Sequence, residues 1–455
     1  MPSSFLTRFL AVDPDRPALR FDRWFSYGEL VALGGAVGGW LRAQGVGPGD
    51  RVVIQRENGL DLVAAHLGCM AVGAVRVPLN AHYRAIEVAP IVEDADPRLV
   101  IALDPGLFPG RRVVERPGTA EPVEAWTEPP DDVTALLFTS GTTGRAKGVP
   151  QTWAMWETNL DALARRWRLA PDDRLHLVLP LFHTHGLVVG LHGTLLRGAS
   201  AVVAERFEPV VPDPGVTHLY GVPTFYRRWL PVMQANPEPF RALRLMVSGS
   251  DGLPAALSDA IHAATGHRIL ERYGMTETVM ITSNPFDGAR RAGTVGTPLD
   301  GVEVRIVDGE VQVRGPSVFT GYQPRPDPDA FTADGWFRTG DAGEQDDAGY
   351  LRIVGRQKDL VIVGGVNVSP AEVEAALASV PGVREVGVCG LPDTDLGEVV
   401  AAAVVGEVAL SALEAAAAGL SGLKRPRRWA FVDALPRNAL GKLQRARIRG
   451  EIFRV

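Results

Sequence analysis

The chain has 455 residues, of which 46% are hydrophobic and 22% are charged, a composition typical of a soluble globular protein with at least two domains. Its formal net charge of −6 gives no nucleic-acid-binding signature, so we expect no nucleic-acid partner. Cys69 and Cys389 lie far apart among apolar residues, which predicts buried free thiols in a reducing cytoplasm and argues against a cysteine-ligated metal.

The first part of the chain alternates between helical and strand patterns. A helix is expected after Ser26, where leucines and valines recur at helical spacing up to residue 41. A strand over 51–54, a helix over 60–74 and a strand over 74–79 follow, and residues 104–132 are expected to be an irregular surface connection. This alternation predicts parallel sheets covered by helices.

A second alternating pattern covers residues 133–285, with strands expected over 174–179, 201–204, 217–220, 244–247 and 268–270. The apolar run over 177–190 is interrupted by Pro180 and two histidines, so we expect no membrane span. Short strands after Pro298 predict a small β-rich lobe. From Gly355 onward, helices over 370–379 and 409–419 predict a small α+β domain.

The expected fold is therefore α/β, with a large N-terminal domain of βα-layered sheets and a β-rich lobe over 1–355. A small, mobile α+β C-terminal domain is expected over 356–455.

Residues 137–149, LFTSGTTGRAKGV, predict a phosphate-binding loop. Glycines let backbone N–H groups approach phosphate oxygens, and hydroxyls and a lysine add further donors. Because no Gly-Lys-Ser/Thr sequence closes the run, it is not a Walker A loop, and it indicates adenylation rather than γ-phosphate hydrolysis. An ordinary Ser/Gly turn is the alternative. The residues expected to hold the nucleotide here are Thr139, Ser140, Gly141, Thr142, Thr143, Gly144 and Lys147.

Residues 271–278, ERYGMTET, follow a predicted strand, where α/β proteins place ligand-binding loops. Tyr273 can present an aromatic face to a base, Thr276 can donate to a phosphate, and Glu277 can hold Mg²⁺ through a hard oxygen. Taken alone, a polar turn with a buried tyrosine explains the segment equally well.

Three further segments are weaker when each is taken alone. Asp341, after a Thr-Gly turn, can accept both hydroxyls of a ribose, although an Asp in a turn is commonly structural. Residues 355–359, GRQKD, suit either a domain hinge or a solvated linker. Lys442, on a glycine-containing turn near the C-terminus, is otherwise a solvated lysine.

Together, these five segments closely resemble the acyl-CoA synthetases of the adenylate-forming (AMP-binding) superfamily. The resemblance covers essentially the whole chain. It implies a two-domain ligase that uses ATP, Mg²⁺ and CoA. A carboxylic acid would be joined to the α-phosphate of ATP with release of pyrophosphate, and its acyl group would then pass from AMP to a thiol.

The resemblance also implies roles for individual residues. Thr276, Glu277 and Lys442 would serve the adenylation step, with Glu277 as the metal ligand and Lys442 bridging the ribose and α-phosphate. Lys358 would be the hinge, and Gly364 and Gly365 would line the thiol tunnel. The remaining nucleotide-binding residues would be Gly249, Ser250, Glu271, Arg272, Tyr273, Gly274, Met275, Asp341 and Arg356.

Three segments, over 181–187, 221–228 and 280–290, resemble malonyl-CoA synthetases. A dicarboxylate leaves its second carboxylate buried, and that charge requires a cation and a hydroxyl. Arg228, Arg290 and Thr184 are the expected donors, and His183 either gates the acyl passage or simply packs. The alternative places both arginines on the protein surface.

Two positions depart from the family pattern. Asp251 stands where relatives commonly have alanine, and an added carboxylate near the acyl site would repel malonate unless it pairs with an arginine or binds a cationic group of the substrate. Ile281 makes the pocket more apolar or accommodates an α-substituent.

Three alternatives to a malonate-type ligase follow from the sequence. The acid could be monocarboxylic, aryl or amino-substituted, or the acyl group could pass to a carrier-protein thiol instead of CoA. A third alternative is a non-catalytic nucleotide-binding protein, which the intact Lys147, Glu277, Asp341 and Lys442 argue against.

Overall fold

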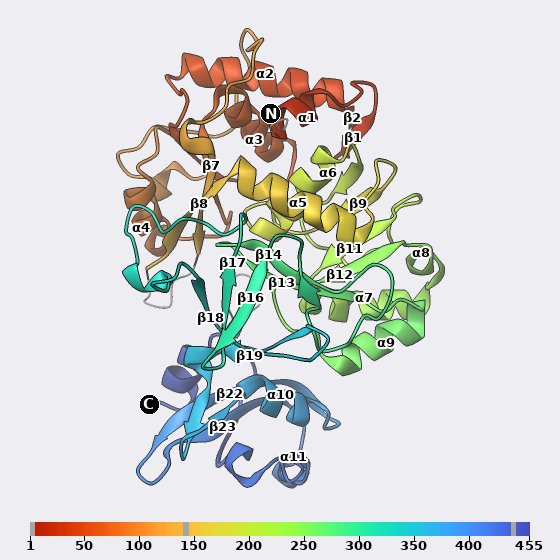
Figure 1. The fold of residues 1–455 in the computed structure, drawn as a ribbon, viewed down its shortest axis with the longest axis vertical. Coiled ribbons are helices and arrows are strands. Elements are labelled where there is room, and N and C mark those ends of the chain that lie inside the picture. Colours follow the sequence, from red (N-terminus) through yellow and green to blue (C-terminus); the bar gives the residue numbers. More distant parts are fainter. Residues whose placement is uncertain (1–4, 140–144, 438–442) are drawn as a thin grey trace. The chain divides into compact units, whose positions relative to one another are not determined.

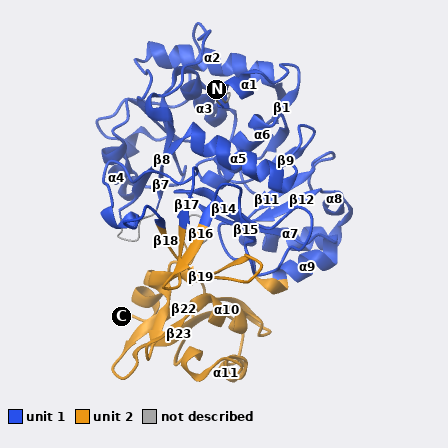
Figure 2. Ribbon diagram, in the orientation of Figure 1, with its two compact units in different colours: residues 1–253, 257–303, 313–337 blue, residues 254–256, 304–312, 338–455 orange. Residues whose placement is uncertain are grey.

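The computed structural model describes residues 5–139, 145–437 and 443–455. The chain divides into two compact units (Figures 1 and 2). The first comprises residues 1–253, 257–303 and 313–337, and the second comprises residues 254–256, 304–312 and 338–455.

The first unit contains two sheets with largely parallel strands. The nine-stranded sheet has the order β15-β14-β13-β12-β11-β9-β10-β1-β2. Its strands are β15 (Thr297–Pro298), β14 (Val279–Ser283), β13 (Leu270–Met275), β12 (Leu245–Ser248), β11 (His218–Gly221), β9 (Arg174–Leu177), β10 (Ser200–Val203), β1 (Pro17–Arg20) and β2 (Trp24–Ser26).

The six-stranded sheet has the order β6-β5-β3-β4-β7-β8. Its strands are β6 (Val113–Val114), β5 (Leu99–Ala102), β3 (Arg51–Gln55), β4 (Val75–Leu79), β7 (Val133–Thr139) and β8 (Lys147–Thr152). Its last pair, β7 and β8, is antiparallel, so the phosphate-loop sequence joins two neighbouring strands.

Alternating strand residues bury both faces of each sheet, as the βα pattern predicts. In β3, Val52 and Ile54 join the main core, whereas Val53 packs in the α4 layer. The main core lies between the sheets and contains α1 (Phe5–Leu10), α2 (Tyr27–Ala43), α3 (Leu60–Val72), α5 (Trp153–Trp167) and the π-helix η3 (His185–His192).

Two outer helical layers complete the unit. The outer face of the nine-stranded sheet packs against α7 (Pro223–Ala235), α8 (Glu238–Arg241) and α9 (Ala255–Thr265), visible in Figure 1. The outer face of the six-stranded sheet packs against α4 (Ala85–Ala95). Helices thus cover the faces of both sheets. Ligand sites in α/β folds lie at the remaining edge, outside the carboxyl ends of the parallel strands.

The second unit contains one four-stranded and one five-stranded sheet. The four-stranded sheet has the order β16 (Glu303–Val307), β17 (Glu310–Arg314), β18 (Phe337–Gln345) and β19 (Leu351–Arg356), and its first three strands begin or end in the other unit. The five-stranded sheet contains β20 (Val361–Val363), β21 (Val366–Val368), β22 (Val383–Asp393), β23 (Gly397–Gly406) and β24 (Arg428–Phe431). Helices α10 (Pro370–Ala378) and α11 (Leu410–Ala417) pack on one of its faces.

These elements confirm the expected α/β class, the β-rich segment and the small α+β segment, with most boundaries within three residues. Cys69 and Cys389 are both buried free thiols. No helix among the described residues is long and apolar enough to cross a membrane. The expected domain boundary at residues 355 and 356 stays a prediction.

Candidate active site

The phosphate-loop motif connects the ends of β7 and β8. Thr139 and Lys147 are opposite each other in this antiparallel pair, and the Thr139 hydroxyl lies 3.5 Å from the Lys147 carbonyl oxygen. The expected phosphate ligands Ser140, Gly141, Thr142, Thr143 and Gly144 lie outside the described residues. The two described ends of the motif are thus held at one edge of the six-stranded sheet.

Lys147 is connected to the ERYGMTET motif through a tyrosine. Its Nζ lies 2.6 Å from Asp327 Oδ2 and 4.8 Å from the ring centroid of Tyr322. The Tyr322 hydroxyl donates to Glu277 Oε1 at 2.9 Å. Lys147 holds the pKa of Asp327 below its usual value. The structure therefore brings together the cation of the first motif and the carboxylate of the second.

The sequence did not single out Asp327 or Tyr322. Both lie in a proline-rich stretch before Trp336. The sequence feature that could have identified them is a carboxylate and an aromatic hydroxyl within that stretch. Asp94 was missed as well. This carboxylate bonds Arg145 at 2.7 Å and Arg325 at 3.1 Å, and so links the exit of the phosphate loop to the Tyr322 segment.

Thr276 and Glu277 lie in the turn between β13 and β14. Gln151 Nε2 donates to the Thr276 carbonyl oxygen at 2.5 Å, and Gln151 Oε1 accepts from Trp156 Nε1 at 2.8 Å. The turn requires Gly274, because a Cβ there would lie 2.0 Å from the Val279 carbonyl oxygen. Thr276 is therefore fixed by α5 and β8 rather than by its own turn alone.

Glu277 has the chemistry of a Mg²⁺ ligand for a phosphate substrate. It is a buried carboxylate, and the described residues contain no group of three or more His, Cys, Asp or Glu side chains that could hold a metal alone. Mg²⁺ is commonly bound by one or two carboxylates together with substrate phosphates and water. A single carboxylate near the phosphate-loop lysine fits that arrangement.

Arg272 is a buried cation on β13. Its exposed fraction is 3%, and its Nε and Nη2 have no hydrogen-bond partner among the described residues. Burial lowers its pKa to about 9, although a guanidinium stays protonated at neutral pH. A buried charge without an anionic partner is costly, so this side chain requires an anion.

Glu271 does not neutralise Arg272, although the two are adjacent in sequence. Successive strand residues point to opposite faces. Glu271 instead accepts from the backbone N–H of Gly293 at 3.1 Å, and burial raises its pKa to about 7. The guanidinium of Arg272 lies against Gly249, where an added Cβ would be 2.3 Å from Arg272 Cζ. Gly249 is thus required by the arginine.

The residues around Gly249 follow β12, the parallel neighbour of β13. Ser248 is paired with Glu271 in the sheet, and its hydroxyl is buried without a hydrogen-bond partner among the described residues. Ser250 has a φ of 68°, an unusual conformation for serine that is common at functional loops. The family resemblance places adenine on Tyr273, beside Gly249 and Ser250. Because β12 and β13 are adjacent, the structure is compatible with this position, which stays a prediction. The role of Met275 also stays a prediction.

The histidine-containing loop after β9 adds further buried polar groups. The Thr184 hydroxyl and both ring nitrogens of His185 have no hydrogen-bond partner among the described residues. The positive charge of Arg272, after burial, contributes to a pKa of His185 well below the usual value. The His183 ring packs against Phe182 with centroids 4.3 Å apart. His185 is therefore neutral, and the charge of Arg272 is one of the influences that keep it so.

The structure does not assemble the expected clamp of Arg228, Arg290 and Thr184. Arg228 lies on the exposed face of α7, with Cζ 4.8 Å from the Phe207 ring centroid. Arg290 donates to the carbonyl oxygens of Arg268 at 2.7 Å, Phe286 at 2.9 Å and Pro285 at 3.2 Å. No hydrogen bond among the described residues joins either arginine to Thr184.

Asp251 is exposed, and its Oδ1 accepts from the Gly252 N–H at 2.9 Å. Its carboxylate is therefore solvated, with no arginine bonded to it among the residues described. Ile281, by contrast, is fully buried in β14.

Two of the expected nucleotide-binding residues lie together in the second unit. Asp341 and Arg356 are opposite each other on β18 and β19, with Arg356 Nε 3.0 Å from Asp341 Oδ1. Asp341 N–H also donates to Thr339 Oγ1 at 3.0 Å. This pair holds the carboxylate in a fixed orientation.

The expected hinge and tunnel residues also belong to the second unit. Lys358 lies in a short 3-10 turn (Gln357–Asp359) directly after β19. Gly364 and Gly365, with φ values of 58° and 82°, form the turn between β20 and β21. Lys442 lies outside the described residues. The roles of these residues stay predictions.

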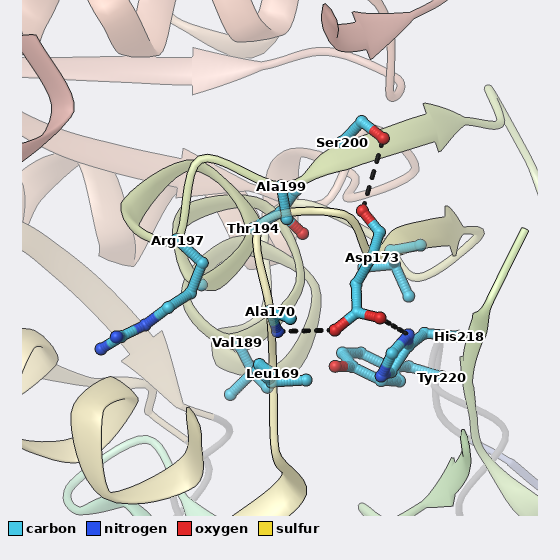
Figure 3. Close-up of a pocket in the computed structure, with 12 residues that line it drawn as sticks. Leu169, Ala170, Asp173, Val189, Thr194, Arg197, Ala199, Ser200, His218 and Tyr220 are labelled. Atoms are coloured by element: carbon cyan, nitrogen blue, oxygen red, sulfur yellow. Dashed lines mark hydrogen bonds and ion pairs between the residues drawn. The ribbon is translucent and has the colours of Figure 1, made fainter. Parts of the chain in front are cut away.

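A small pocket lies elsewhere, at the amino ends of β9, β10 and β11 (Figure 3). Its polar lining includes Asp173, Ser200 and His218, and Asp173 accepts from the Ala170 N–H at 2.7 Å. Ligands of parallel sheets bind at the opposite, carboxyl ends. None of the motif residues lines this pocket, so it is not the candidate active site.

Known proteins resemble the whole chain. Residues 6–323 match the AMP-binding enzyme family, and residues 372–442 match the AMP-binding enzyme C-terminal domain. A malonate–CoA ligase of Arabidopsis thaliana is 33% identical over 96% of this chain and 86% of its own length. A sulfoacetate–CoA ligase of Cupriavidus necator is 34% identical, over 96% of this chain and 94% of its own.

Solved structures give the same result. The ATP-bound structure of MatB from Rhodopseudomonas palustris is 37% identical and matches with a TM-score of 0.93, over 100% of this chain and 99% of that one. The family matches, the two ligases and this structural likeness agree with the adenylation motifs found in the sequence. The chain therefore belongs to the AMP-binding enzyme family and is an ATP-dependent, AMP-forming acyl-CoA ligase.

Proposed function

We propose that this ligase activates a small acid that carries a second anionic group, with malonate or a substituted malonate as the preferred substrate. Buried Arg272 carries the proposal, because its charge has no anionic hydrogen-bond partner among the described residues. A second carboxylate on the substrate would supply one and form charge-assisted hydrogen bonds. The unpartnered hydroxyl of Thr184 offers a neutral donor to the same group.

The names of the relatives support this assignment. Malonate and sulfoacetate are both small acids with a second acidic group, and ligases for both are similar to this chain over nearly its whole length. The fixed cation thus accounts for a feature that the two substrates share. Arg272, which the sequence resemblance assigned to nucleotide binding, is proposed here as the specificity residue in place of Arg228 and Arg290. Ile281 would pack against the substrate's α-carbon substituent.

The proposed chemistry has two steps. One carboxylate oxygen of the acid bonds to the α-phosphorus of ATP as the bond to pyrophosphate breaks, giving an acyl-adenylate. The CoA thiolate then bonds to the acyl carbon, and AMP leaves. Charge grows on the phosphoryl oxygens in the first step, and Lys147, Thr276 and Lys442 are the proposed donors that stabilise it.

Mg²⁺ held by Glu277 would neutralise phosphate charge when bound. We assign the ribose to Asp341 and Arg356, and adenine to Tyr273. We also propose that residues 356–455 rotate about Lys358 between the two steps, withdrawing Lys442 and presenting Gly364 and Gly365 to the thiol. The proposed setting is the cytoplasm, where ATP and CoA are available.

An acid panel tests the substrate class. ATP–pyrophosphate exchange is measured with malonate, methylmalonate, monomethyl malonate and butyrate, and thioester formation is measured with CoA or a holo carrier protein. We expect kcat/KM for malonate to exceed that for monomethyl malonate by roughly 30-fold or more, because a buried ion pair is lost. Equal use of malonate and butyrate would contradict the proposal.

Single substitutions test which arginine binds the second anionic group of the acid. Arg228→Ala and Arg290→Ala should each change the preference for malonate over butyrate by less than about threefold, because their guanidinium groups lie at the surface or bond loop carbonyls. If either variant loses that preference while Arg272→Met retains it, the second anionic group does not bind at Arg272.

A further inference from the structure

A second fully buried arginine, Arg76 on β4, has all its nitrogens engaged. Its Nε donates to the Thr134 carbonyl oxygen at 3.0 Å, its Nη2 donates to the Thr134 hydroxyl, and its Nη1 lies 2.9 Å from His192 Nε2. Its Cζ is 4.8 Å from the ring centroid of Trp153 and 5.0 Å from that of Trp156. The guanidinium is thus held by Thr134 of β7 and by three rings, those of His192, Trp153 and Trp156.

Arg76 determines which nitrogen of His192 carries the proton. A guanidinium has only donors, so His192 Nε2 must accept. Burial, reinforced by Arg76, keeps the pKa of His192 well below its usual value, and the ring is neutral. The single ring proton therefore lies on Nδ1, which is 2.8 Å from the Leu187 carbonyl oxygen and donates to it.

This hydrogen bond spans the last turn of the π-helix η3. Leu187 and His192 are five residues apart, which is the spacing of π-helical backbone bonds. All eight residues of η3 are buried, and the helix starts at His185, directly after Thr184. Its first turn is constrained as well, because a Cβ on Gly186 would lie 2.2 Å from the Pro180 carbonyl oxygen.

We infer that Arg76 and His192 are positioning residues for the acyl site. Arg76 fixes the Nδ1–H tautomer of His192, His192 holds Leu187 in the π-helical conformation, and the π-helix places Thr184 and His185 near Arg272. Neither residue touches the substrate. A π-helix is rare and of marginal stability, so an extra side-chain bond at its end favours it over an α-helix. An α-helical register would rotate the residues that precede it.

Two His192 variants and an NMR measurement test this inference. In ¹⁵N-histidine-labelled wild-type protein at pH 7, the His192 signal should show a protonated Nδ1 and an unprotonated Nε2. His192→Leu should raise KM for malonate by about 10- to 100-fold, the size of effect that a small misplacement causes, with KM for ATP within about twofold. His192→Asn keeps a short donor beside the Leu187 carbonyl oxygen and should recover most of the loss.

His176→Leu is the matched control, since it removes another buried imidazole, on β9. It should leave KM for malonate within about threefold of wild type. A protonated His192 Nε2, or a normal KM for malonate in His192→Leu, would overturn the inference. So would an equal rise in KM for ATP, because the effect would then pass through Trp156 and Gln151 to Thr276.

The kinetic comparison rests on the proposed substrate class, whereas the NMR measurement does not. If the proposed function fails, wild-type protein shows no malonate-dependent exchange. If only the positioning inference fails, wild-type exchange is normal and the His192 variants behave like the His176 control.

Discussion

The candidate site has a phosphate end around Lys147 and a proposed acyl end around Arg272. The two ends differ in whether the positive charge is already paired with a carboxylate of the protein. At the phosphate end, Lys147 is already paired with Asp327, and both side chains are about 30% exposed, at 29% and 30%. At the proposed acyl end, Arg272 is buried, and its Nε and Nη2 have no hydrogen-bond partner among the described residues. The first end can exchange one counter-ion for another, whereas the second obtains its counter-ion only from a ligand. On the proposed assignment, this difference is the reason why one end serves the chemistry common to the family and the other selects the acid.

The largest expected effect comes from the phosphate end. Glu277→Gln keeps the shape of the side chain and an oxygen for the Tyr322 hydroxyl, but removes the proposed Mg²⁺ ligand charge. We expect kcat for ATP–pyrophosphate exchange to fall about 10²- to 10³-fold, as when one transition-state contact is lost. The loss should be equal for every acid that the enzyme uses. A loss confined to dicarboxylic acids would contradict the separation of the two ends.

The second prediction concerns stability at the acyl end. Arg272→Met replaces an uncompensated buried charge with an apolar side chain, and should raise the free energy of unfolding of the ligand-free protein by about 1–4 kcal/mol. Urea denaturation without ligands measures this. Lys147→Met is the comparison, and should leave stability nearly unchanged or lower it, because it breaks a paired charge. Destabilisation by Arg272→Met would show that the charge is compensated within the protein.

Glu271 makes the stability depend on pH. Its pKa is raised to about 7 in the folded protein from an ordinary value of 4.5, so the folded state retains a proton that the unfolded chain releases. Stability should therefore fall as pH rises from about 4.5 to about 7, and Glu271→Gln should abolish that part of the fall, worth about 1–3 kcal/mol.

Denaturation at pH 5 and pH 8 measures the Glu271 effect. Glu303→Gln is the control, since Arg314 holds the pKa of Glu303 below its usual value and it does not titrate in this range. A difference between wild type and Glu271→Gln that stays constant over this range would contradict the assignment.

The smallest effect is expected at Asp327. Asp327→Asn removes the carboxylate that competes with phosphate for Lys147, and should tighten ATP binding about two- to fivefold, the range of a partly exposed ion pair. Calorimetric titration at low salt shows it best, since salt screens the pair. Asp329→Asn changes the same charge in the same turn without a bond to Lys147, and should have no such effect. Weaker ATP binding in Asp327→Asn would mean that Asp327 positions the lysine instead.

Most of the fold follows from patterns that are local in the sequence. Apolar runs such as 99–102 and 245–247 are continuous because both faces of their strands are buried, and the glycines and prolines between them mark the turns. The π-helix at His185–His192 could not be predicted, since its apolar residues fit any buried helix, and its spacing depends on Arg76, which is 116 residues from His192.

The candidate site was predicted where a motif is contiguous. Thr276, Glu277, Asp341 and Arg356 lie in segments whose order resembles the family. The proposed acyl site rests instead on which side chains are buried without partners, and this is decided by packing between distant strands. Arg272 and Arg290 look alike in sequence, yet one is left without an anion and the other bonds three carbonyl oxygens.

Acid selectivity in Arg272→Met tests the central claim most directly. The variant and the wild type are compared in ATP–pyrophosphate exchange with malonate and with monomethyl malonate, whose second carboxylate is a neutral ester. We predict that wild type prefers malonate by roughly 30-fold or more, and that Arg272→Met loses this preference while it still exchanges with the neutral ester. If Arg272→Met keeps the wild-type preference, or loses exchange with both acids equally, Arg272 does not bind the second anionic group.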